Sequence, residues 1–63
     1  MDLVNILNNF SSKRDIFEFL RDRRLSDFSV KELDEALLML DISPQNYSTK
    51  EDKFRAIVNW YRP

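Results

Sequence analysis

The chain of 63 residues contains no cysteine, no histidine and no glycine, and each absence excludes a class of protein. Without cysteine or histidine there is no disulfide and no ordinary ligand set for a structural zinc ion. A thiolate nucleophile and a side chain that titrates near neutral pH are missing as well. Without glycine there is no Walker loop and no dinucleotide-binding fingerprint. We therefore expect a non-enzymatic protein with no cofactor and no bound metal.

The length of the chain sets a second limit. Residues 1–63 suffice for a single small helical domain. A domain of this size buries only about 60% of the surface that its unfolded chain exposes, so its stability margin is small. The fold must therefore depend on an apolar core, or on a partner that stabilises the folded state.

Net charge and hydropathy indicate an intracellular globular protein. Ten basic and eleven acidic side chains give a net charge of −1, whereas nucleic-acid-binding domains are more often clearly basic. A hydrophobic fraction of 43% is too high for a disordered chain. No apolar run approaches the length of a membrane span, and the chain does not start with a basic and then apolar secretory signal. We expect a cytoplasmic or otherwise intracellular protein without a membrane partner.

Three serines mark the starts of helices. Ser12, Ser29 and Ser48 are each followed three residues later by Asp or Glu, the spacing of a helix capping box, and each precedes an apolar periodic stretch. Asp2 is the expected cap of the first helix, and no segment alternates with a period of two. The sequence therefore predicts an all-α fold, a compact bundle of four short helices without a sheet. The helices are expected at residues 3–10, 13–24, 30–40 and 49–61, with the third at the centre.

Apolar spacing predicts which side chains form the core. The third helix repeats Val30, Leu33, Leu37 and Leu40 at helical spacing, with Ala36, Leu38 and Met39 broadening its apolar face, and Phe54, Ile57, Val58 and Tyr61 line the fourth. We expect Trp60 to complete the core with its N–H at the rim, the alternative being an interface anchor. Tyr47 is expected to be partly exposed. Asn8 and Asn9 tolerate the left-handed geometry that often ends a helix.

The densest basic feature is the group Arg21, Arg23 and Arg24 at the end of the second predicted helix. Guanidinium groups match phosphate and carboxylate groups bidentately, so the cluster is a candidate contact for a phosphate or an acidic partner. The other interpretation is a favourable interaction of cations with the negative end of the helix.

Charge is also segregated along the chain. Residues 13–24 hold five basic and three acidic side chains, residues 28–41 one basic and four acidic, and residues 49–63 four basic and two acidic. The acidic helix can pair with its basic neighbours inside the monomer, which we favour, or the molecule can present oppositely charged faces to a complementary protein.

Two parts of the chain resemble known families. Residues 25–58 contain Leu25-Ser26-Asp27-Phe28-Ser29-Val30-Lys31-Glu32-Leu33, then Leu37, Leu40, Ile42 and Thr49-Lys50. This pattern resembles a SAP domain, a small helix-extended-helix module, and the resemblance implies DNA binding. Residues 48–60 contain Ser48, Glu51, Phe54, Ala56, Ile57, Val58 and Trp60. This pattern resembles the BACK domain of BTB-Kelch adaptor proteins, and it implies a protein–protein adaptor.

Our leading hypothesis is a protein–protein interaction module or small regulatory protein that binds a macromolecular partner through a basic and aromatic surface. The alternative is a DNA-binding helix-turn-helix or SAP-like module that uses the fourth helix for recognition. A homodimer through the wide apolar arc of the second helix is a third possibility. The candidate partner-binding residues are Arg21, Arg23, Arg24, Lys50, Lys53, Arg55, Asn59 and Arg62.

Overall fold

The computed structural model describes residues 2–63, which form four α-helices joined by short connections. The helices are α1 (Leu3–Asn9), α2 (Lys13–Arg21), α3 (Val30–Met39) and α4 (Lys50–Tyr61). Two single-turn 3-10 helices lie in the longer connections, η1 (Leu25–Asp27) before α3 and η2 (Pro44–Asn46) before α4. Within residues 2–63 there is no strand, so the predicted all-α fold is confirmed.

Side-chain caps start the helices as the sequence indicates, with one shift. The Ser12 hydroxyl accepts the Asp15 N–H at 3.2 Å, and the Asp2 carboxylate accepts an N–H of α1. Ser29 forms a complete capping box, because its hydroxyl accepts the Glu32 N–H at 3.1 Å while Glu32 accepts the Ser29 N–H at 3.2 Å. The cap predicted at Ser48 is wrong.

Thr49, rather than Ser48, caps α4. Its hydroxyl accepts the Asp52 N–H at 3.0 Å. Both residues have a hydroxyl and an acid three positions later, so the local pattern fits two registers that differ by one residue. Helix α4 therefore starts at Lys50, and its buried residues are Ile57 and Tyr61.

The second helix is shorter than predicted. It ends at Arg21 instead of residue 24, because the Asp22 N–H bonds to the Phe19 carbonyl and the Arg23 N–H to the Leu20 carbonyl, both in the tighter i to i−3 pattern. Arg23 and Arg24 therefore lie in the connection to η1. Only Arg21 of the predicted arginine cluster occupies the last helical turn.

The left-handed residue lies at the end of α3, not at Asn8 or Asn9. Asp41 has φ 62°, its N–H bonds to the Leu38 carbonyl, and the next N–H, of Ile42, bonds to the Leu37 carbonyl at 2.9 Å. These two bonds make a Schellman motif, which glycine usually closes. In this chain without glycine, an aspartate takes that position.

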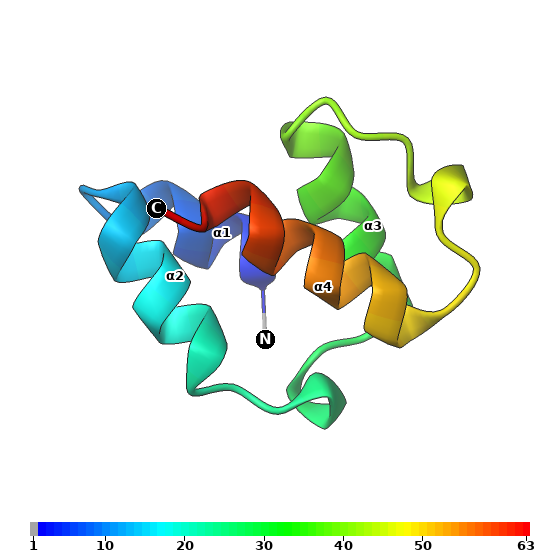
Figure 1. The fold of residues 1–63 in the computed structure, drawn as a ribbon, viewed down its shortest axis with the longest axis horizontal. Helices are drawn as coiled ribbons and strands as arrows, with labels where there is room; N and C mark the ends of the chain where they lie inside the picture. Colours follow the sequence, from blue (N-terminus) through cyan, green and yellow to red (C-terminus); the bar gives the residue numbers. More distant parts are fainter. Residues whose placement is uncertain (1) are drawn as a thin grey trace.

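Helix α4 runs across the middle of the molecule, with α2 on one side and α3 on the other (Figure 1). It packs on both of them, while α1 packs on α3. The third helix, predicted to lie at the centre, shares that position with α4. None of the helices formed by residues 2–63 combines the length and the apolar character that a membrane span needs.

One continuous core joins the helices, and its ten members are Leu3, Leu7, Ile16, Leu20, Phe28, Leu33, Ala36, Leu37, Ile57 and Tyr61. Four large apolar side chains predicted to be inside are instead exposed. Leu38 is 62% exposed and Trp60 42%, and Val30 and Met39 also face solvent. A domain this small has too little interior to bury every apolar residue of a wide helical arc.

Candidate interaction surface

One side of α2 carries Lys13, Phe17 and Arg21. These residues are spaced four apart, so their side chains lie above one another along the helix. Lys13 and Arg21 are exposed and Phe17 is half-buried. Arg14 lies beside this row. By the periodicity of the helix, Asp15 occupies its opposite side. Asp22 follows the end of α2 and lines a second hollow with Glu18 and Arg21.

The end of α4 contributes aromatic and basic groups to the same row. The Lys13 ammonium lies 4.2 Å from the centre of the Trp60 ring. The Arg62 guanidinium lies 5.9 Å from the centre of the Phe17 ring, and that of Arg21 lies 5.8 Å from the same centre. Two arginines from distant parts of the sequence are thus brought to one ring. The basic/aromatic face is defined as Lys13, Arg14, Phe17, Arg21, Trp60 and Arg62.

A hollow of about 320 Å³ lies in this face, lined by Arg14, Phe17, Glu18, Arg21 and Pro63. Its single acidic side chain, Glu18, pairs with the Arg14 guanidinium at 3.5 Å. The hollow therefore combines positive charge with apolar surface. Guanidinium groups bind carboxylates or phosphates by charge-assisted hydrogen bonds, while an aromatic ring offers a surface for apolar groups.

Trp60 is held at the surface by its neighbours. Its ring meets that of Tyr61 edge-on, with centres 4.8 Å apart, and Lys13 covers part of one side. Tyr61 itself is buried, and burial raises the pKa of its phenol because the charged phenolate would lose its hydration. The aromatic pair therefore has a core member and an exposed member. The prediction that Trp60 completes the core is wrong.

Within residues 2–63, Lys13, Arg21 and Arg62 form no ion pair with a carboxylate. Two other cations of α4, Lys53 and Arg55, do form ion pairs. The Lys53 ammonium lies 2.7 Å from Asp34 of α3, and its side chain is only 14% exposed. The Arg55 guanidinium lies 2.9 Å from Glu51. Lys53 and Arg55 are thus already occupied within the chain.

The eight predicted contact residues consequently do not form one surface. Arg21 and Arg62 meet at Phe17. Arg23 lies over the ring of Phe19, 4.7 Å from its centre, at the edge of the molecule beyond α2. Arg24 is exposed in the connection, where its N–H bonds to Asp27.

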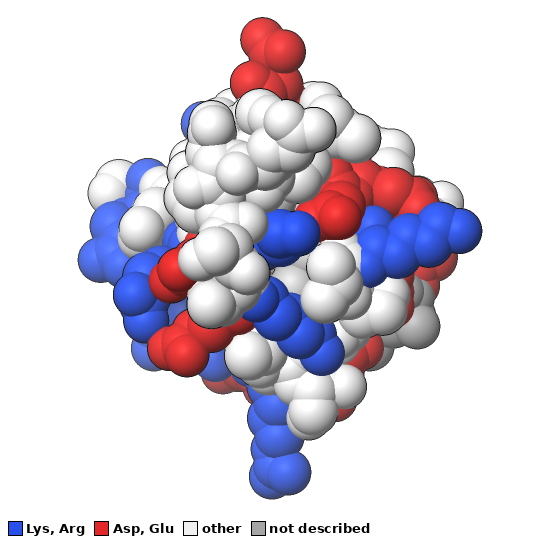
Figure 2. All heavy atoms as spheres, turned by 90° about the vertical axis from the view of Figure 1, so that its right-hand side faces the viewer, with Lys and Arg blue, Asp and Glu red and all other residues white. Residues whose placement is uncertain are grey.

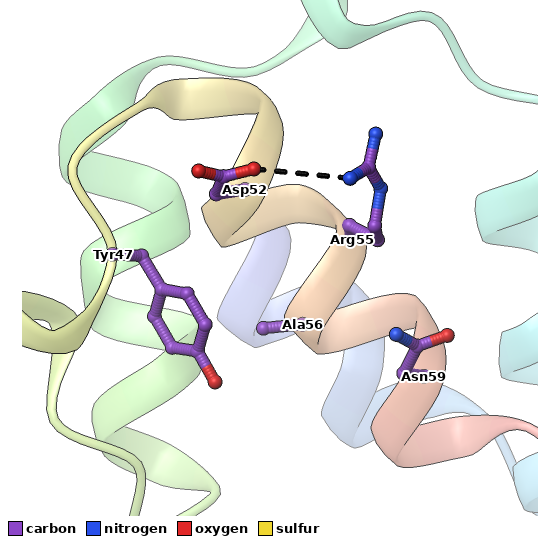
Figure 3. Close-up of a pocket in the computed structure, with 5 residues that line it drawn as sticks. All are labelled: Tyr47, Asp52, Arg55, Ala56 and Asn59. Atoms are coloured by element: carbon purple, nitrogen blue, oxygen red, sulfur yellow. Dashed lines mark ion pairs between the residues drawn. The ribbon is translucent and has the colours of Figure 1, made fainter.

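The other four predicted residues lie along α4 and divide between two of its sides. Lys50 and Lys53 are on the side near α3. Arg55 and Asn59 face a shallow groove of about 240 Å³, lined also by Tyr47, Asp52 and Ala56 (Figure 3). In this groove Arg55 is directed at Asp52, 3.9 Å away. Tyr47 is half-buried there, as predicted.

A continuous basic surface is not seen where a helix-turn-helix would present α4. The face that carries η2 and the start of α4 shows Lys and Arg interleaved with Asp and Glu (Figure 2). The segment between α3 and α4 spans ten residues, 40–49, and includes η2, longer than the turn of about three or four residues that the motif uses.

Sequence reasoning missed Lys13, Arg14 and Phe17. The spacing of Lys13, Phe17 and Arg21 was the available signal, but it does not reveal that the end of α4 packs beside this row. Among residues 2–63, no group of three or more acidic side chains is arranged to hold a metal ion.

Comparisons with family models, with curated proteins and with solved structures find no match to this chain. The fold defines an all-α globule of four helices. The resemblances to SAP and BACK domains stay predictions.

Proposed function

We propose that this chain is a non-enzymatic interaction module, or a small regulatory protein, that binds another protein through the basic/aromatic face. One observation carries the proposal: the exposed ring of Trp60 lies beside the Lys13 ammonium, which has no carboxylate partner among residues 2–63. Tryptophan and arginine are the residues most enriched among those that dominate binding energy at protein interfaces. A bound partner would also stabilise a domain whose own core is small.

The proposal predicts binding that depends on Trp60. A random peptide library displayed on phage is selected against the immobilised protein, and the enriched peptides are synthesised and titrated. We expect Trp60→Ala to weaken binding about tenfold or more, the usual cost of removing a dominant interface residue. Leu38→Ala is the matched control, because Leu38 is exposed on α3, away from the face. Equal affinity for Trp60→Ala and wild type would refute the proposal.

The alternative function is DNA binding through α4. The exposure of Asn59 and Arg62 near the end of this helix favours it. Phosphate contacts are strongest at low salt, so a labelled generic DNA duplex titrated there is the most sensitive test. We expect no detectable binding. A tight complex with a steep salt dependence would support the alternative.

A further inference from the structure

We infer that the segment recognised by the basic/aromatic face is an acidic peptide with an apolar side chain next to its carboxylates. This inference rests on the proposed function and names the chemistry of the partner. It is argued from the charge of the face, from the way its cations are held, and from the shape of the hollow.

The face has an excess of positive charge in a chain that has none overall. It includes four cations, Lys13, Arg14, Arg21 and Arg62, while Glu18 is the acidic side chain that lines its hollow. The net charge of the whole chain is −1. Complementary potentials across an interface favour association and exclude partners of the same sign, so this face fits an acidic segment.

Arg14 is paired with Glu18, but the other three cations of the face are positioned without being neutralised. A cation over an aromatic ring at an exposed site is weakly attracted to it, yet it keeps its charge and its N–H donors. The guanidinium groups of Arg21 and Arg62 are both held in this way at Phe17. Because the ring restricts these side chains before binding, they lose less conformational entropy when a carboxylate arrives.

The lining of the hollow favours an acidic peptide over a simple polyanion. Phe17 and Pro63 line it together with Arg14 and Arg21, and its volume of about 320 Å³ is large enough for an apolar side chain. A phosphate chain offers charge without an apolar group for this surface. A peptide in which an apolar residue is flanked by carboxylates satisfies both features.

The test uses fluorescence anisotropy with a labelled peptide of alternating glutamate and leucine. Two double variants are compared, Arg21→Gln with Arg62→Gln, and Arg23→Gln with Arg24→Gln. Both remove the same charge, but only the first removes groups at Phe17. We expect the first pair to lose about tenfold or more in affinity, because it removes two guanidinium groups that donate charge-assisted hydrogen bonds to the peptide carboxylates. The second pair is expected to lose less than about threefold.

Equal losses in the two double variants would show general electrostatic attraction and would overturn the inference. Inorganic polyphosphate binding more tightly than the peptide would overturn it too. If the glutamate–leucine peptide does not bind at low salt while library-selected peptides still require Trp60, the inference fails and the proposed function stands. If the selected peptides do not require Trp60 either, both fail. Circular dichroism of each variant verifies that the helices are retained.

Discussion

Where α4 packs on α3, the cation Lys53 pairs with a carboxylate, whereas where α4 packs on α2, Lys13 and Arg62 lie against aromatic rings. Lys53 is largely buried against Asp34 and joins the two central helices. Lys13 and Arg21 are exposed and rest on Trp60 and Phe17. The first arrangement uses charge to hold the monomer together, while the second leaves charge available to a partner.

This difference has an energetic consequence. A cation–aromatic contact at the surface adds little to stability, while removing one member of a partly buried ion pair leaves the other desolvated without compensation. Substitutions where α4 packs on α3 are therefore expected to change the free energy of unfolding. Substitutions where α4 packs on α2 are expected to change binding.

The largest expected effect on the free energy of unfolding comes from a substitution in the hydrophobic core. Leu37 is fully buried, and Leu37→Ala is expected to destabilise the fold by about 2–5 kcal/mol, enough to unfold much of a domain this small. Leu38→Ala, one residue later and 62% exposed, is expected to change stability by less than about 0.5 kcal/mol. Urea denaturation followed by circular dichroism measures both. Similar effects would show that α3 is packed differently.

The next largest effect compares a cation in an ion pair with a cation on an aromatic ring. Lys53→Met removes the partner of Asp34 and is expected to cost about 1–2 kcal/mol, because the half-buried carboxylate loses a charged hydrogen-bond donor. Arg21→Met, on the basic/aromatic face, is expected to cost less than about 0.5 kcal/mol. Equal destabilisation of the two variants in urea would contradict the distinction.

The capping box at the start of α3 predicts a dependence on pH. Burial alone would raise the pKa of the Glu32 carboxyl, but the pKa lies below its ordinary value, because hydrogen bonds from the Ser29 N–H and hydroxyl, with a further one from the Leu3 N–H, contribute to lowering it. Since the lowered pKa belongs to the folded state, Glu32 contributes stability at neutral pH and loses it as the pH falls through the acid range. Thermal melts of Glu32→Gln should show a smaller loss of stability below about pH 4.3 than the wild type.

Ser29→Ala removes the hydroxyl of the same capping box. We expect it to lower the free energy of unfolding by about 1 kcal/mol at neutral pH. It should also lose part of the pH dependence, while Ser29→Thr retains the hydroxyl and should keep it. A Ser29→Ala melt that falls with pH as steeply as the wild type would refute the role given to Glu32.

The smallest expected effect on stability comes from glycine substitutions at the ends of α3 and α2. Asp41 is left-handed, so Asp41→Gly is expected to stabilise the fold by about 0.5–1 kcal/mol. Asp22, which ends α2 with φ −86°, is in the right-handed region. There the same substitution is expected to destabilise by a comparable amount. Melting temperatures that move in the same direction would contradict this assignment.

Much of the fold was predictable from local signals. Ser12 and Ser29 fix the starts of α2 and α3 through their own hydroxyls, and helical spacing identifies Leu33, Leu37 and Ile57 as core. Helix ends were less predictable. Neither glycine nor proline occurs directly after Arg21, so the sequence contains no strong stop signal for α2 there. The position of its last turn depends on packing.

The candidate surface was only half predictable. The sequence singles out Arg21 by its basic cluster and Arg62 by its place in the candidate recognition helix, but their meeting at Phe17 depends on how α2 and the end of α4 cross. In so small a domain, a large aromatic side chain such as Trp60 is expected to complete the core, with its N–H at the rim. Its exposure follows from Ile57 and Tyr61 already filling the inward side of α4.

The most direct test of the account uses the indole N–H of Trp60, which gives a single resonance because the chain contains one tryptophan. A nitrogen–proton correlation spectrum is recorded while a library-selected peptide is added. The account predicts that this resonance shifts together with the backbone signals of Lys13, Phe17 and Arg21. An indole signal that stays in place while shifts gather on α3 or around Tyr47 would contradict it.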